Sequence, residues 1–324
     1  MKKTATLAAI LFGCILLSCC MGRYYLSPID IVNIILGNHA SNMDANVFLN
    51  IRLPRTLVVV ISGGALALSG FVYQSLFRNP LVSPDVLGVS SGASVGAIIG
   101  ILFFRQSPLL IQTLSFALGI LVVLLSIALA HVMGGKRLYT LILSGIIVGS
   151  LANSVIMVFK YTADPNRHLS AIEYWLMGSF NTVLWKDMYL LLPLCFIASV
   201  ILFLLKRQLR AISLGDEDAQ SLGVNVRLIR ILAIILSTVL VTSVVSIAGV
   251  VSWIGLIVPH ITRFFGEENY LQNFDQSILL GGILLLSADT LARNLFSSEI
   301  PISILTSLMG AIFLLIFLRL KNRG

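Results

Sequence analysis

The sequence predicts an all-α fold: a polytopic membrane protein with about ten transmembrane helices. Hydrophobic residues make up 57% of the 324 positions and charged residues only 11%, whereas a typical soluble domain carries about 25% charged residues. The apolar residues form runs close to the ~20 residues that span a bilayer, and the basic residues lie between these runs. This composition excludes a soluble enzyme and a disordered or fibrous chain.

Ten hydrophobic segments follow one another along a single integral membrane domain, residues 1–324. The first is interpreted as a retained span. A cleaved lipoprotein-type signal is the alternative because Cys19 follows an apolar run, but bulky Leu17 is atypical of such signals. The eighth segment is short and a Pro-rich turn separates the second from the third, so nine or eleven spans stay open. The segments are 4–21, 56–77, 86–104, 109–133, 138–159, 188–205, 231–248, 250–265, 276–292 and 301–318.

The distribution of Lys and Arg predicts the orientation of the chain. With the N-terminus inside and ten spans, 14 of the 22 basic residues fall in inside segments and 8 in outside segments. Because inner loops of membrane proteins are enriched in Lys and Arg, we expect both termini in the cytoplasm and the chain in the cytoplasmic (inner) membrane of a prokaryote. The same bias explains the net charge of +8 without a nucleic-acid partner.

Three loops are long enough to hold structure of their own. Residues 22–54 and 160–187 are outer, periplasmic-side loops, and residues 206–227 form the longest inner loop. Apolar and aromatic residues predict a short helix at the lipid interface in each outer loop, over residues 28–36 and 170–177. Small residues crowd several spans, as at Gly63, Gly70 and Gly281, which predicts close packing of helix backbones.

Motifs for catalysis are missing from the sequence. There is no GxxxxGK[ST] phosphate-binding loop and no HExxH, and the four cysteines show no metal-ligand spacing. We therefore expect no enzyme activity, and no cofactor or metal in this chain. Acids within the spans are few, with Asp289 the main one, which favours an external energy source over proton coupling.

The inner loop carries the signal of a short amphipathic helix. Acidic residues stand at its start, where they favour a helix N-terminus, and a glycine follows its last turn, as is typical of a helix C-terminus. Its spacing E-x-A-x-x-x-G resembles a reduced form of the loop with which ABC importer permeases dock on an ATPase subunit. A solvated connector helix is the alternative. The residues expected to couple to an ATPase are Leu214, Gly215, Asp216, Glu217, Ala219, Leu222 and Gly223.

The turn after the second segment is predicted to be irregular. Pro80 and Pro84 prevent a continuous helix through residues 78–88. Irregular backbone at membrane depth is tolerated where it is buried in protein or lines a water-filled cavity. The turn is therefore expected to border a translocation path, with a simple cytoplasmic turn as the alternative.

Considered together, the motifs resemble the permease (membrane-spanning) subunits of the binding-protein-dependent ABC importers for ferric siderophores, haem and vitamin B12, which are type II importers. The matching stretches occur in family order and cover nearly the whole chain. They are residues 52–55, 64–70 with Gln74, 78–84, 87–88, 91–93, 175–179, 222–224, 248–249, 255–263 and 288–293.

The resemblance implies partners: a second copy of this chain as a homodimer, two ATP-binding subunits that hold ATP and Mg, and a substrate-binding protein at the outer face. In relatives, arginines at three matching positions meet carboxylates of the binding protein; here these are Arg52, Arg55 and Arg293. Lipid-headgroup anchoring or internal pairing, for example of Arg293 with Asp289, is the alternative. The resemblance places the cytoplasmic gate at Asn79, Leu81, Leu138 and Tyr139, although Leu138 and Tyr139 stand where some relatives carry small hydroxyl residues.

The sequence thus predicts a permease that moves a metal chelate across the membrane by alternating access, driven by ATP hydrolysis in the separate subunits. Ferric siderophore or haem is favoured over cobalamin. Nothing in the spans names the ligand, so an oxyanion such as molybdate is an alternative cargo. A secondary transporter that depends on a buried acid such as Asp289, and a channel or assembly protein without active transport, are the alternatives from other classes.

Overall fold

The computed structural model describes residues 2–38, 42–104, 107–134, 138–265 and 270–321. No strand occurs in this described part, so the predicted all-α fold is confirmed. The longer helices are α1 (Lys2–Cys20), α4 (Leu53–Phe77), α5 (Val89–Phe103), α6 (Pro108–Val132), α7 (Leu138–Thr162), α9 (Trp185–Leu204), α12 (Val226–Ala248), α13 (Ile254–Phe265), α14 (Tyr270–Asn294) and α15 (Ile302–Lys321).

Each of the ten predicted segments coincides with one of these helices. Seven helical stretches among the described residues are long and apolar enough to cross a membrane, while α5, α13 and the apolar part of α15 are shorter. Several helices begin before the apolar run. For example, α4 begins at Leu53 because Pro54 fits the first turn of a helix, and α12 begins at Val226 because the Asn225 side chain accepts a hydrogen bond from the Leu228 amide at 3.1 Å.

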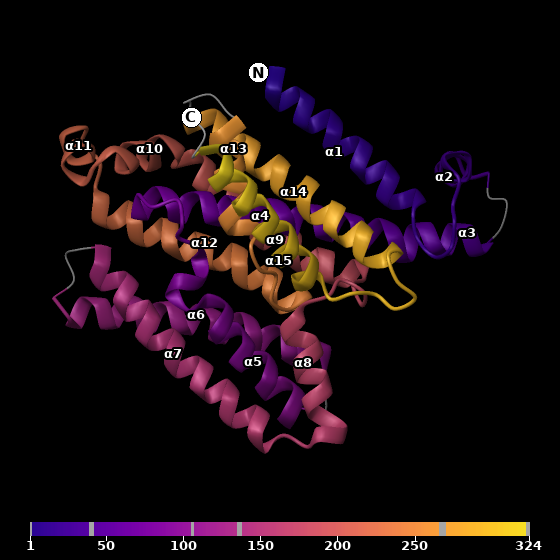
Figure 1. Cartoon of the computed structure of the whole chain (residues 1–324), viewed down its shortest axis with the longest axis horizontal. Helices are drawn as coiled ribbons and strands as arrows, with labels where there is room; N and C mark the ends of the chain where they lie inside the picture. The colour runs from indigo at the N-terminus through magenta and orange to yellow at the C-terminus, as the bar shows by residue number, and fades with distance from the viewer. Residues whose placement is uncertain (1, 39–41, 105–106, 135–137, 266–269, 322–324) are drawn as a thin grey trace.

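The loops hold short helices at the two ends of the bundle (Figure 1). The predicted interfacial helices are α2 (Pro28–Ile35) and α8 (Ser170–Met177), and the first outer loop also contains α3 (Asn42–Asn46) and a π-helical turn, Val47–Arg52. The inner loop folds into α10 (Lys206–Leu214) and α11 (Asp216–Ser221). Figure 1 places the start of α1 and the end of α15 on the side of α10, and α2, α3 and α8 toward the opposite end. These two ends of the bundle are called inner and outer, respectively, after the predicted orientation.

The core is built around α4, whose residues are nearly all buried along its length. Glycines set how closely its neighbours approach. A side chain at Gly63 would overlap the carbonyl of Gly281 in α14, and one at Gly70 would overlap the carbonyl of Gly255 in α13. The close packing predicted from small residues is confirmed at these two crossings.

The outer ends of α12 and α15 are tied together by the segment after α8. Gly178, which has φ 70°, accepts a hydrogen bond from the Ile302 amide at 2.9 Å. The next residue, Ser179, donates its amide to the carbonyl of Ala248 at 2.7 Å. A side chain at Gly178 would overlap the carbonyl of Val250, so this position requires glycine for both its conformation and its contact.

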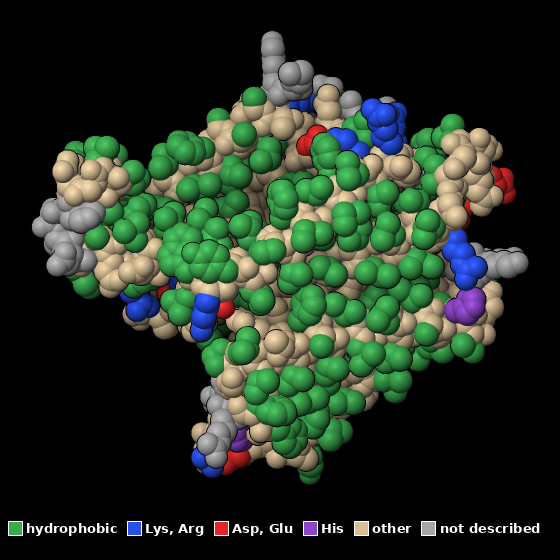
Figure 2. Space-filling model, turned by 180° about the vertical axis from the view of Figure 1, so that it is seen from behind, with side chains coloured by type: hydrophobic (Ala, Val, Ile, Leu, Met, Phe, Trp, Pro, Cys, Tyr) green, Lys and Arg blue, Asp and Glu red, His purple; other side chains and the backbone are tan. Residues whose placement is uncertain are grey.

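The face opposite the view of Figure 1 is almost continuously apolar. Figure 2 shows hydrophobic side chains over most of it, with Lys, Arg, Asp and Glu gathered at the rim. A surface of this kind suits a hydrocarbon environment with polar groups at the interfaces.

Replacing Gly70 with Ala is expected to lower the melting temperature of the detergent-solubilised chain, because the methyl group cannot fit against the Gly255 carbonyl. Overpacking of this kind costs about 1–3 kcal/mol. Gly13→Ala in α1 is the matched control, since a Cβ at Gly13 meets nothing within 4 Å. Equal melting temperatures for both variants would contradict a tight crossing of α4 and α13.

Candidate functional site

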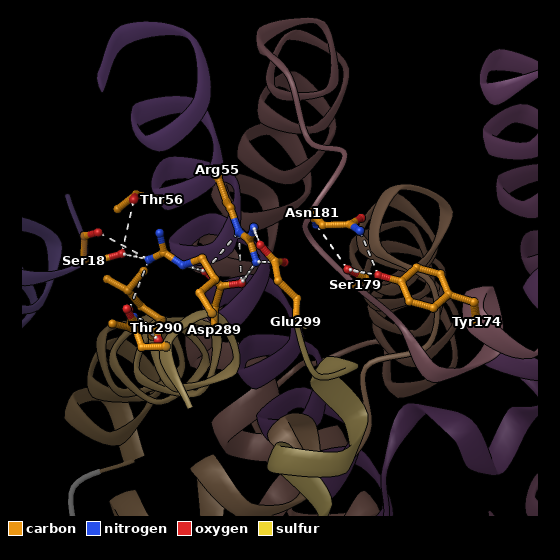
Figure 3. A network of polar contacts seen from close by, with 12 residues as sticks. Ser18, Arg55, Thr56, Tyr174, Ser179, Asn181, Asp289, Thr290 and Glu299 are labelled. Atoms are coloured by element: carbon orange, nitrogen blue, oxygen red, sulfur yellow. Dashed lines mark hydrogen bonds and ion pairs between the residues drawn. The ribbon is translucent and has the colours of Figure 1, made fainter. Parts of the chain in front are cut away.

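Buried ion pairs join the outer ends of α4 and α14 (Figure 3). Arg55, in the first turn of α4, places its Nη2 atom 2.8 Å from Oδ1 of Asp289 and 2.9 Å from Oε2 of Glu299. Arg293, one turn after Asp289 in α14, pairs with the other carboxylate oxygen of Asp289 at 3.2 Å. Asp289 therefore serves two guanidinium groups, and Glu299, with 27% of its side chain exposed, closes the network toward the surface.

Hydrogen bonds from the same group of arginines hold the end of α1. Arg52 donates from Nη1 to the carbonyl oxygens of Cys19 at 2.6 Å and Cys20 at 2.9 Å. Arg293 donates from Nη2 to Oγ of Ser18 at 2.7 Å. The last carbonyls of a helix lack partners within the helix, so Arg52 caps α1 while Arg293 connects it to the ion pairs.

The three arginines expected to meet a binding protein are therefore buried in this conformation. Arg52 is 4% exposed, and Arg55 and Arg293 are each 7% exposed. The contacts correspond to the internal-pairing alternative, including the Arg293–Asp289 pair. A carboxylate from another protein would have to displace Glu299 to reach Arg55 as it now lies. No local sequence signal marks Glu299, which lies far from Arg55 along the chain and outside every motif.

The predicted coupling residues form an exposed helix at the inner end. Leu214 and Leu222, which flank α11, are 65% and 69% exposed. Glu217 is exposed on α11 and Ala219 faces inward, while Gly215 is buried. Gly223 follows the helix with φ 79°, a conformation that favours glycine at a helix end. Exposed apolar residues at both ends of a short helix suit docking on another protein.

Asp216 joins this exposed helix to the body of the molecule. Arg230 in α12 donates from Nη2 to both oxygens of Asp216, at 2.8 and 2.9 Å. Nη2 of Arg78 lies 3.6 Å from Oδ1 of the same carboxylate. Arg78 ends α4 in the left-handed conformation, with φ 50°, and begins the inner turn. The acid that opens α11 thus connects the loop to two spans and to the turn.

The inner turn is irregular, as predicted. Residues 78–88 contain one short 3-10 turn, Pro84–Leu87, and no α-helix. The Asn79 side chain accepts a hydrogen bond from the Leu81 amide at 2.9 Å, and Leu81 is 66% exposed. Asn79 therefore shapes the turn, while Leu81 is available to contact a neighbouring chain.

The other two gate candidates lie at the start of α7. Leu138 is partly buried against the core, whereas Tyr139 is 61% exposed. The turn reaches α7 further along that helix, where a side chain at Gly145 would overlap the carbonyl of Val86. The structure therefore brings the turn and α7 into close contact at Gly145, about two helical turns after Leu138.

Two cavities open beside the turn. One, of about 260 Å³, lies between the turn, α4, α5, α12 and the segment 251–256. The other, of about 360 Å³, lies between the end of α4, the end of α10 and the start of α14. Arg263 at its wall donates to the Gln74 side chain, and Gln74 donates to the Leu256 carbonyl at 2.9 Å. Within the described residues, no three His, Cys, Asp or Glu side chains gather as metal ligands.

Comparison with known proteins places this arrangement in a family of transporters. The model of the FecCD transport family matches residues 10–320. The chain is 36% identical to the molybdate import system permease protein MolB of Haemophilus influenzae, with 97% of each chain covered. It is 38% identical to the hemin transport system permease protein HmuU of Yersinia pestis, over 86% of this chain and 85% of the relative.

A solved structure supports the same placement. An ABC transporter assigned to the metal-chelate type, in an inward-facing conformation, superimposes with a TM-score of 0.89 at 34% identity. The match covers 98% of this chain and 99% of that chain. The arrangement of spans, and not only the sequence motifs, is therefore shared with that transporter.

Replacing Asp289 with Asn is expected to destabilise the chain by about 3–5 kcal/mol, because it leaves two buried guanidinium groups without their anion. Thermal unfolding of the purified chain measures the effect. Glu299→Gln is the matched control: its partly exposed side chain keeps its hydrogen-bonding shape, so a loss of about 1 kcal/mol or less is expected. If the two variants lose the same stability, Asp289 does not anchor the network.

Proposed function

Because this chain belongs to the FecCD transport family, as a permease of an ABC importer, we propose that two copies of it enclose a path for a metal chelate. ATP hydrolysis in two separate subunits, which bind ATP and Mg, drives transport, and a substrate-binding protein delivers the cargo at the outer face. Both termini and α10–α11 then lie in the cytoplasm, with the chain in the inner membrane. The observation that carries the proposal is the exposed α11, tied by Asp216 to the inner turn.

The ATPase contact follows from the surface of α11. Leu214, Glu217 and Leu222 are exposed there, and exposed apolar side chains at an aqueous surface are typical of docking sites. A movement imposed on α11 reaches Asp216 first, and through it Arg78 and the start of the inner turn. This connection supplies a physical route from ATP hydrolysis to a cytoplasmic gate that contains Asn79 and Leu81, with Tyr139 on the adjoining end of α7.

The second copy follows from the surface of α7. Asn153, near the middle of this 25-residue span, is exposed, as are Ser150 and Ser154. The Ser154 hydroxyl bonds the Ser150 carbonyl at 3.0 Å, but no hydrogen bond of the Asn153 side chain is found within the described residues. An amide facing hydrocarbon without a partner costs several kcal/mol. We infer that this face of α7 lines the path or packs against the partner copy.

We propose that the binding protein docks at the outer ends of α1, α4 and α14, which the three arginines hold together. Arg52, Arg55 and Arg293 fix the ends of α1, α4 and α14 relative to each other. A direct ion pair with the binding protein remains part of the proposal for Arg55, whose partner Glu299 is the exposed member of the network.

We propose only the chemical class of the cargo, on the basis of the relatives that the chain resembles. A metal chelate, with ferric siderophore or haem favoured and cobalamin as a further candidate, agrees with the hemin permease and the metal-chelate type structure. Molybdate is the second candidate because a molybdate permease is similar over 97% of both chains. An ion-driven secondary transporter is disfavoured, since the acid it would use, Asp289, is occupied by two arginines.

Co-purification tests the proposal directly. The tagged chain, expressed together with the ATPase and the binding protein of its source organism's importer, is expected to give a complex of two permeases and two ATPases by native mass spectrometry. Leu222→Asp should remove the ATPase, because a charge replaces the exposed apolar contact. Ser221→Asp, which adds the same charge one residue earlier on an exposed hydroxyl, is the matched control and should keep it. A chain that purifies without any ATPase would contradict the proposed function.

A further inference from the structure

An acidic side chain lies exposed in the irregular part of the inner turn. Asp85 belongs to the 3-10 turn Pro84–Leu87 between α4 and α5, and its side chain is exposed. The Ser90 hydroxyl donates to its carboxylate, and no salt bridge to Asp85 is found within the described residues. An exposed carboxylate without a cationic partner is unusual within a span region, so its surroundings decide what it does.

Helix lengths place this carboxylate at membrane depth. α5 has 15 residues, which corresponds to a length of about 22 Å, whereas the hydrocarbon core is about 30 Å thick. A helix of this length cannot cross the whole core. Leu66, in the middle of α4, lines the same cavity as Asp85, so the turn before α5 lies within the membrane rather than at its inner surface. α13 is shorter still, with 12 residues, and begins beside the same turn: a Cβ at Gly255 would lie 3.6 Å from Cδ of Pro84.

Two interrupted spans thus meet at one level. The segment before α13 contains Trp253 in the left-handed conformation, with φ 73°, which is a strained backbone for a bulky residue. The indole fits against Gly310 of α15, where a Cβ would approach it to 2.6 Å. Paired interruptions of this kind are where membrane transporters place their binding sites and paths.

The cavity of about 260 Å³ lies between the two interruptions. Asp85 lines it together with the hydroxyl residues Ser83, Ser90 and Ser252, and Trp253 forms part of its apolar wall. No Lys or Arg is among its lining residues. Two arginines described on the inner side, Arg78 and Arg263, line the other cavity and contact Asp216 and Gln74, respectively. Among the described residues, no Lys or Arg at the wall of this cavity therefore compensates the Asp85 carboxylate.

A local structural role accounts for only part of this arrangement. Asp85 stands just before α5, where a carboxylate favours the helix N-terminus. A neutral Ser or Asn satisfies that need about equally well, and capping gives no reason for the carboxylate to be exposed. Because lipid does not accommodate an exposed charge at this depth, the carboxylate must face water, and the water at this level belongs to the path.

Resting on the proposed function, we propose that Asp85 makes the inner part of the translocation path negative, so that it admits neutral or cationic metal chelates and disfavours oxyanions. In a homodimer the two Asp85 carboxylates act on the same cargo. A like charge brought within several ångströms of them is repelled, and an opposite charge is attracted. Asp85 is then a specificity-determining residue, and the molybdate alternative becomes the less favoured cargo of this chain.

Charged thiol reagents of matched size test the charge of the path without knowledge of the cargo. The full permease–ATPase complex is prepared with Cys14, Cys19, Cys20 and Cys195 replaced by Ala and with Ser252→Cys as the reporter. Rates of modification by a cationic and an anionic methanethiosulfonate are each divided by their rate on a free thiol. We expect the cationic reagent to react about tenfold faster than the anionic one. Asp85→Asn should bring the ratio near one, and Asp85→Glu should restore it.

Tyr161→Cys provides the control, because this outer residue of α7 is 92% exposed and its ratio should not change with Asp85→Asn. Equal rates at Ser252→Cys with Asp85 in place, or a faster anionic reagent, would overturn the charge selection. No modification with either reagent, in both nucleotide-free and ATP-bound complexes, would show that the cavity is not on the path and would also overturn the inference. Each of these results would overturn only the role of Asp85. The proposed function fails instead if no ATPase joins the complex.

Discussion

The structure depends on how α4 is held, because this helix carries an arginine at each end and is buried between them. At the outer end Arg55 needs an anion, since an unpaired guanidinium cannot be buried in a bilayer at acceptable cost. Asp289 of α14 and Glu299 supply it. At the inner end Arg78 pairs with Asp216 of the loop that contains α10 and α11. Between these pairs, glycine contacts with α14 and α13 fix the spacing. The chain has few charges, and several of them fix the position of this one helix.

This arrangement suggests how a signal crosses the protein. A helix of 25 residues is about 37 Å long, so a displacement of α4 along its axis moves both of its ends. Its outer end is joined to α1 and α14, where a binding protein is proposed to dock. Its inner end is joined to α11, where an ATPase is proposed to dock. The inner turn follows directly after Arg78, so a displacement of Asp216 relative to α4 acts on the residues proposed as the gate and on Asp85 beyond them.

Much of the fold is predictable because the bilayer imposes a length on each apolar run. The ten apolar helices, the two short helices of the outer loops and the acidic start of α11 all follow from local patterns. The helix ends do not, because polar residues such as Arg55 and Arg230 continue helices beyond the apolar run once they have partners. The resemblance to relatives predicts that the outer arginines face another protein, whereas the structure buries them. Their burial depends on Glu299 and on the carbonyls of α1, which are distant in sequence and carry no pattern of their own. The cargo is not predictable in this way, since a molybdate permease and a hemin permease are both similar to this chain in sequence over most of its length.

If α11 moves the inner turn through Asp216, the distance between the two copies of that turn in the proposed homodimer depends on both bound nucleotide and Asp216. Spin labels at Leu81→Cys, in a background free of the four native cysteines, report this distance in the complete complex by pulsed electron resonance. A non-hydrolysable ATP analogue is predicted to change the distance in the otherwise unaltered chain, but not in Asp216→Asn, provided that native mass spectrometry shows the ATPase still bound. The same nucleotide-dependent change of distance in both proteins would show that α11 does not act on the turn through Asp216.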